Sequence, residues 1–125
     1  MNYAMHAYQK TAQTGTSPRQ LEATLLMKAA TRLKAVQDNW DNDQSDLEAA
    51  VIYNRKLWTI LATSATDAES GLPSELKQNI AMIAIFIFNR SLDLIVAPKM
   101  TDLDVLIEIN RNIATGLSAV PKAAA

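Results

Sequence analysis

Apolar residues recur along most of the chain at spacings of three and four, which is the period of an amphipathic α-helix. No stretch shows the strict apolar–polar alternation that marks a half-buried strand. The four prolines, at positions 18, 73, 98 and 121, all fall at expected helix edges. The pattern therefore predicts an all-α fold, a single compact bundle of about five helices.

The helix boundaries follow from the residues that begin and end each periodic stretch. A first helix is expected over residues 2–13, with a mobile arm over residues 1–16 as the alternative. The other four are expected from Pro18 into the polar loop 38–44, from Ser45 to just before Ser70, from Ser74 to Val96, and from Thr101 to a stop at Gly116. Residues 118–125 are expected to form a frayed tail.

Three of these starts carry residues suited to helix N-termini. Ser17 with Gln20, and Ser45 with Glu48, fit the capping box, in which each member satisfies a free backbone N–H. Thr101 is the expected cap of the last helix.

The helix expected over residues 74–96 is apolar on two sides. One face holds Leu76, Ile80, Ile83, Ile87 and Leu94, and a roughly opposite face holds Ile85, Phe88 and Leu92. A helix that is apolar most of the way round is normally buried. We therefore expect it at the centre of the bundle, with the preceding and following helices against it. The alternative leaves one face open, as a groove that accepts a partner's helix.

Asparagine interrupts three of the apolar stripes. Asn54 follows Leu47 by seven residues, Asn110 follows Leu103 by seven, and Asn79 lies on the main face of the next-to-last helix. A buried amide without partners costs about 1–3 kcal/mol. We expect these three asparagines to form a hydrogen-bonded polar layer that fixes helix register. The alternative is a site that recognises a partner's backbone.

Trp40 stands in the polar loop 38–44, where tryptophan is unusual. It is expected to fold back as a lid over the core, with a contact surface for a partner as the alternative. The basic residues of the helix before it are Arg19, Lys28, Arg32 and Lys34. Without aromatic residues for base stacking, they predict a solvated face rather than an RNA site.

Composition narrows the possible chemistry. The 125 residues, 49% apolar and 20% charged, predict one globular domain over residues 1–125. There is no cysteine and one histidine, His6, which argues against thiolate metal sites and a conventional catalytic triad. No acidic residue is expected within an apolar stripe, where burial would raise its pKa. We therefore predict no enzyme, no catalytic residues, no metal site and no cofactor.

Charge and hydropathy bear on location. The net charge of −1 argues against nucleic acid as a partner. The first ten residues show no export signal, and the longest apolar run, residues 80–88, is shorter than the roughly 20 residues that span a bilayer. We expect a cytoplasmic protein that does not insert into membranes.

Several segments resemble, in order and spacing, the FlaF family of flagellar biosynthesis regulatory proteins of alphaproteobacteria. They are Ser17–Glu22, Ala29–Leu33, Tyr53–Thr59, Leu72–Pro73, Gln78–Ile80 and Ile107–Leu117. The more specific parts are Asn-Arg-x-Leu-Trp at 54–58 and Ile-Asn-Arg-x-Ile-Ala-x-Gly-Leu at 109–117. Residues 81–82 depart from the family, whose members often have Asn-Leu there.

This resemblance implies a role in making and exporting flagellin, together with the regulator FlbT, and assigns no catalytic residues. Flagellin's terminal segments form amphipathic helices on assembly, and a cytoplasmic chaperone can shield such helices in an apolar groove. Candidate contact residues are Ile85, Phe88, Leu92 and Trp40. The alternatives are a regulator that acts on flagellin mRNA with FlbT, and an adaptor that links FlbT or the export machinery.

Overall fold

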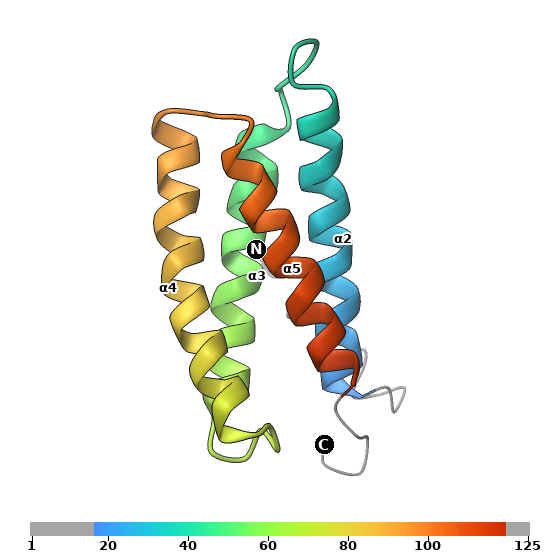
Figure 1. The fold of residues 1–125 in the computed structure, drawn as a ribbon, viewed down its shortest axis with the longest axis vertical. Helices are drawn as coiled ribbons and strands as arrows, with labels where there is room; N and C mark the ends of the chain where they lie inside the picture. Colours follow the sequence, from blue (N-terminus) through green and yellow to red (C-terminus); the bar gives the residue numbers. More distant parts are fainter. Residues whose placement is uncertain (1–16, 120–125) are drawn as a thin grey trace.

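A computed structural model describes residues 17–119 of the chain. Within this range it has four helices and no strand: α2 (Pro18–Asp38), α3 (Leu47–Thr66), α4 (Ser74–Val96) and α5 (Asp102–Ser118). The helices run alternately in opposite directions and form an antiparallel bundle (Figure 1). The all-α prediction is confirmed, with four described helices against about five expected. The helix expected over residues 2–13 and the tail 120–125 lie outside the described residues.

The order of the helices around the bundle differs from the prediction. Helix α2 packs along α5 and also against α3, while α4 packs mainly against α3 and only slightly against α5. Figure 1 shows α4 at one edge of the bundle. The expectation that α4 is central is wrong, although its two neighbours among the described helices are α3 and α5, as expected. Each of the four described helices has two neighbours, and the most extensive pairing is that of α2 with α5.

The core forms where the four inner faces meet. Its largest fully buried side chains include Trp58, Leu26, Leu33, Leu57, Leu61, Ile80, Ile87, Leu94, Leu103, Leu106 and Leu117. Helix α4 contributes Ile80, Ile87 and Leu94, which recur every seven residues and so share one face. Trp40 is partly buried and packs against this core, as a lid would.

The expected capping boxes do not form. Helix α3 begins at Leu47 rather than Ser45, and none of the four described N-caps makes a side-chain capping bond. The Asp46 carboxylate accepts from Arg32 Nε at 2.7 Å and Nη2 at 2.6 Å, tying the start of α3 to α2. At the start of α5, Asp104 Oδ1 accepts from Gln37 Nε2 of α2 at 2.6 Å. These side chains join helices instead of capping them.

Helix α5 also ends later than expected. Gly116 was predicted as its stop, yet the helix continues to Ser118. A glycine that ends a helix normally adopts a positive φ. Among the described residues only Gly71 does so, with φ of 76° in the loop before α4. Gly116 is therefore a helical residue without a conformational need for glycine.

We expect Gly116→Ala to raise the free energy of unfolding by about 0.5–1 kcal/mol, because alanine loses less backbone entropy in a helix. A Cβ at this position would meet no atom within 4 Å. Denaturant unfolding measures the change. Gly71→Ala is the contrasting control and should destabilise the fold by about 1–2 kcal/mol, since its backbone is left-handed. A loss of stability in Gly116→Ala would contradict this assignment.

The Arg32–Asp46 ion pair predicts that the stability of the fold depends on pH. Hydrogen bonds from Arg32 lower the pKa of Asp46 below its ordinary value. The ionised Asp46 carboxylate therefore stabilises the fold at pH values above the pKa of aspartate in the unfolded chain, about 3.9. This stabilisation is lost as the pH falls through the lower pKa of Asp46 in the folded protein. Because the pair is partly exposed, Asp46→Asn should lower stability at pH 7 by only about 0.2–1 kcal/mol.

The difference between the wild-type protein and Asp46→Asn should therefore shrink below about pH 4, as followed by urea unfolding at several pH values. Asp41→Asn, in the exposed loop before α3, serves as the control. An undiminished difference at low pH would show that the carboxylate acts through something other than its charge.

Candidate functional site

Two of the three predicted polar-layer residues meet in the core. Asn110 Nδ2 on α5 donates to Asn54 Oδ1 on α3 at 2.7 Å, and to the backbone oxygen of Leu26 on α2 at 3.3 Å. Trp58 Nε1 donates to Asn110 Oδ1 at 2.9 Å. Asn54, Asn110 and Trp58 are fully buried. The Asn110 amide is thus hydrogen-bonded at both ends, whereas Asn54 Nδ2 is buried without a hydrogen-bond partner. Because both side chains are fully buried, they are closed to an outside partner.

Asn79 does not join this layer. It is exposed on α4, one residue before the buried Ile80. Successive helical residues are turned by about 100°, so Asn79 lies to the side of the row formed by Ile80, Ile87 and Leu94. The expectation that Asn79 shares the layer with Asn54 and Asn110 is wrong.

Removal of the central amide should destabilise the protein. Asn110→Ala leaves the buried Trp58 N–H and Asn54 oxygen without their partner, so we expect the free energy of unfolding to fall by about 1–3 kcal/mol. Thermal and urea unfolding measure this. Asn79→Ala, on the surface of α4, is the matched control and should change stability by less than about 0.5 kcal/mol. Equal stabilities of the two variants would contradict the role of the network.

A buried ion pair near the start of α2 was missed in the sequence. Arg19 Nε lies 3.1 Å from Glu22 Oε1, and both side chains are almost wholly buried. Arg19 Nη2 also donates to Ser64 Oγ on α3 at 2.8 Å. The expectation that no acidic residue lies within an apolar stripe is wrong. Glu22 precedes the core residue Ala29 by seven positions, and this spacing was the available signal.

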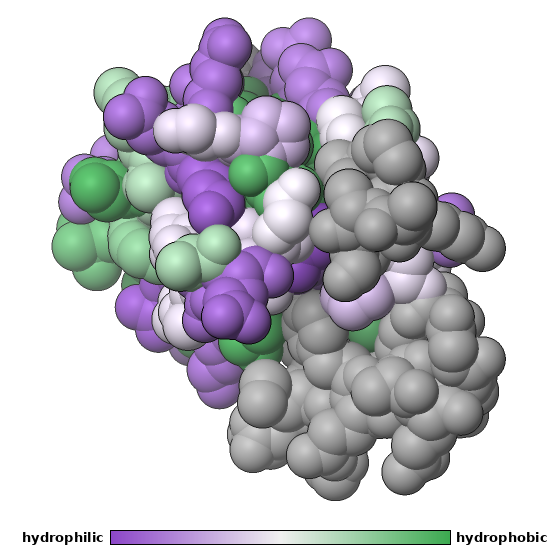
Figure 2. All heavy atoms as spheres, turned by 90° about the horizontal axis from the view of Figure 1, so that it is seen from below, coloured by the Kyte–Doolittle hydropathy of each residue, from purple (hydrophilic) through white to green (hydrophobic). Residues whose placement is uncertain are grey.

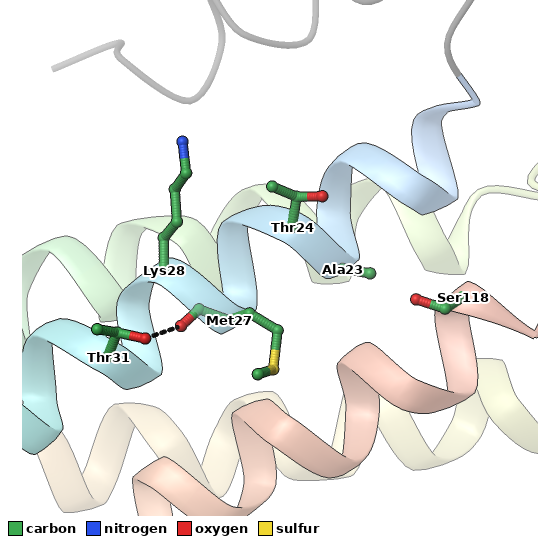
Figure 3. A pocket seen from close by; sticks show the side chains of 6 residues that line it. All are labelled: Ala23, Thr24, Met27, Lys28, Thr31 and Ser118. Carbon is green, nitrogen blue, oxygen red and sulfur yellow. Dashed lines mark hydrogen bonds between the residues drawn. The ribbon is translucent and has the colours of Figure 1, made fainter.

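The other basic residues of α2 are mostly engaged as well. Arg32 bonds Asp46, as described, and Lys34 Nζ lies 3.0 Å from Asp38 Oδ1. Lys28 stands beside a shallow, open depression between α2 and α5, and its side chain extends away from α5 (Figure 3). The depression is lined by small and weakly polar residues, Ala23, Thr24, Thr31 and Ser118, together with Met27. This surface offers neither a catalytic group nor a continuous run of free cations.

Nor do acidic residues gather into a metal site. Within residues 17–119, no group of three or more His, Asp or Glu side chains is arranged to hold a metal ion. His6 lies outside the described residues.

The outer face of α4 is the distinctive surface of the bundle. Met82, Ile85, Leu92 and Val96 are 70%, 62%, 59% and 75% exposed. Phe88 is partly buried against the core. Figure 2 shows apolar surface gathered on the side where Figure 1 places α4. We call the exposed residues 82, 85, 92 and 96 the α4 strip.

The α4 strip corrects the expectation that the second face of this helix is covered. Helix α4 lies at the edge of the bundle, so neighbours cover only its inner side. Ile85 and Leu92 consequently face solvent, as in the groove alternative, and Phe88 lies beside them at the margin of the core. Trp40 lies in the loop between α2 and α3, whereas the α4 strip belongs to a different edge of the bundle.

By length and composition, helix α4 is also long and apolar enough to cross a membrane. Of its most apolar 18-residue stretch, 28% is buried inside the bundle. This revises the expectation that no segment is apolar enough to do so. The longest uninterrupted apolar run is short. The mean hydropathy over 18 residues is nevertheless high, because the few polar side chains do not outweigh the apolar residues of segments 80–88 and 92–96. One such helix is weak evidence for a membrane span.

Comparisons with known proteins bear on the identity of this bundle. Neither the curated proteins nor the solved structures give a significant match. The family model described as flagellar protein FlaF matches residues 4–117, a range that contains nearly all of the described bundle and the whole α4 strip. The chain therefore belongs to the flagellar protein FlaF family.

Proposed function

We propose that this chain is a cytoplasmic regulator of flagellin production and export that binds flagellin as a chaperone does. The observation that carries the proposal is the α4 strip, together with membership of a flagellar family. Contiguous exposed apolar surface on a small domain commonly marks a site of protein interaction. A binding role also agrees with the absence, among the described residues, of a cluster suited to metal chemistry.

The spacing of the α4 strip fits a helical ligand. Residues 82, 85, 92 and 96 recur at intervals of three, seven and four, so their side chains lie on one face of the helix, with Asn89 between Ile85 and Leu92. An amphipathic helix docks against such a row through its own residues at i, i+3, i+4 and i+7. Flagellin's terminal helices, which are unpaired before assembly, offer that pattern. Phe88, beside the strip, would form the base of the contact.

We place the protein in the cytoplasm rather than in a bilayer. Helix α4 packs on α3, and its residues Ile80, Ile87 and Leu94 are fully buried, so the bundle already uses one face of this helix. Arg90 Nη1 lies 2.9 Å from Asp102 Oδ1 of α5 and anchors the helix from its polar edge. Inserting α4 into lipid would separate these contacts and bury charged groups at high cost.

Among the alternatives, a protein partner is favoured over RNA. Three of the four basic residues of α2 are held by carboxylates, and one of them, Arg19, is buried. Phosphate binding requires several free cations and falls steeply with salt, whereas an apolar contact does not. FlbT is the second candidate occupant of the α4 strip.

The α4 strip can be tested directly. We expect Ile85→Glu and Leu92→Glu to fold normally, because both side chains are exposed, and to lose flagellin binding by about tenfold or more. Pull-down of purified flagellin, with a far-UV spectrum and melting curve for each variant, measures both properties. Met27→Glu is the matched control, since Met27 is an exposed apolar residue on α2, which does not pack against α4.

A folded Ile85→Glu variant that still retains flagellin would reject the α4 strip as the binding site. Repeating the wild-type measurement at low and high salt separates an apolar contact from binding through charges. The same variants, tested against purified FlbT, show whether this surface serves the adaptor alternative instead.

A further inference from the structure

The exposed face of α4 carries the spacing of a coiled-coil seam. Met82, Ile85, Asn89, Leu92 and Val96 follow one another at intervals of three, four, three and four. This is the alternation of a and d positions in a heptad repeat, which places all five side chains along one line of the helix. Asn89 is exposed and occupies the central a position of the seam. The core-facing residues Ile80, Ile87 and Leu94 lie on the opposite side of the same helix.

Asn89 restricts the kind of helix that fits this seam. A purely apolar ligand would bury its amide without a partner, at a cost of about 1–3 kcal/mol. A second copy related by a two-fold axis near this residue brings an identical amide, which can both donate and accept. Single asparagines at a positions specify two-stranded pairing in this way. We propose that the protein forms a symmetric homodimer through α4, with the two-fold axis close to Asn89.

The charge and shape of the molecule are compatible with this partner. The net charge is −1, so two copies repel each other weakly. Helix α4 lies at the edge of the bundle, with α3 and α5 behind it, which leaves its outer face open along its length (Figure 1). No charged residue occupies the seam between Met82 and Val96, so an approaching copy desolvates apolar groups and the two amides.

The size of the seam sets the expected strength. From Met82 to Val96 the seam is about 21 Å long and about 10 Å wide. A face of this size is smaller than that of a stable dimer and belongs with weak, transient interfaces. We therefore expect weak self-association, with monomer and dimer in exchange.

The dimer uses the surface to which flagellin binding is assigned above, so the two contacts exclude one another. Self-association would shield the α4 strip until flagellin displaces the second copy. The dimer is tested in the absence of flagellin, and flagellin binding by its own pull-down. A failure of one proposal is therefore distinguishable from a failure of the other.

The oligomeric state of the full chain is the first test. Sedimentation between about 1 and 300 μM should show a concentration-dependent dimer. Asn89→Lys places like charges near the two-fold axis and should weaken the dimer by about 100-fold while the circular dichroism spectrum stays unchanged. Asn79→Lys, an exposed asparagine of the same helix outside the seam, is the matched control and should dimerise like the wild type. Ile85→Glu is a second variant that should give a folded monomer.

Cross-linking supplies the position of the axis, because the chain has no cysteine of its own. Asn89→Cys should form an oxidised dimer in high yield, whereas Asn79→Cys should not. A wild-type protein that stays monomeric throughout the concentration range would overturn the proposal. So would a dimer that Asn89→Lys leaves intact, or one that cross-links through position 79 and not 89. Co-sedimentation of a monomer with anionic lipid vesicles would overturn it in favour of a membrane surface.

Discussion

The hydrogen bonds of Asn110 set the arrangement on which the other contacts depend. They join α5 to Asn54 of α3 and to the backbone of α2, with Trp58 completing the amide's partners. Helices α3 and α5 lie diagonally across the bundle and do not pack closely, so this link spans the core. Apolar contacts are non-directional and tolerate rotation of a helix, whereas buried amides do not. The network therefore fixes the rotation of three helices.

Among the helices of residues 17–119, only α4 lies outside this network, and it is also the one with two apolar faces. It is attached by its inner apolar face to α3 and by Arg90 to Asp102 at the start of α5. Helix α5 pairs closely with α2 and only slightly with α4, so α4 is covered mainly from the side of α3. A helix at the edge has only one face to bury inside its own chain, so its second apolar face is available for intermolecular contact.

Periodicity predicted the helices well and their arrangement poorly. The extent of α4 was correct, and spacing from Leu47 and Leu103 placed Asn54 and Asn110 on buried faces. The prediction that α4 is central was wrong. An apolar face indicates that it packs against something, but it does not tell whether its partner belongs to the same chain or to another. The box at Ser45 failed because α3 begins at Leu47. The residue that precedes this helix, Asp46, gives its oxygens to Arg32, 14 residues away, a contact that local rules do not include. Periodicity identified the second apolar face of α4 as a candidate site. It could not tell whether this face is exposed, because exposure depends on tertiary packing.

The unequal attachment of the helices has a consequence for motion. Opening of α4 away from α3 breaks one apolar contact surface and one ion pair, while opening of α5 breaks the amide network and its long contact with α2. Sub-global unfolding proceeds through the least costly opening. Helix α4 is thus the natural cooperative unit to detach first, with its amide hydrogens exchanging ahead of those of α2 and α5. The helix that carries the contact surface is then also the one whose position can adjust to what it binds.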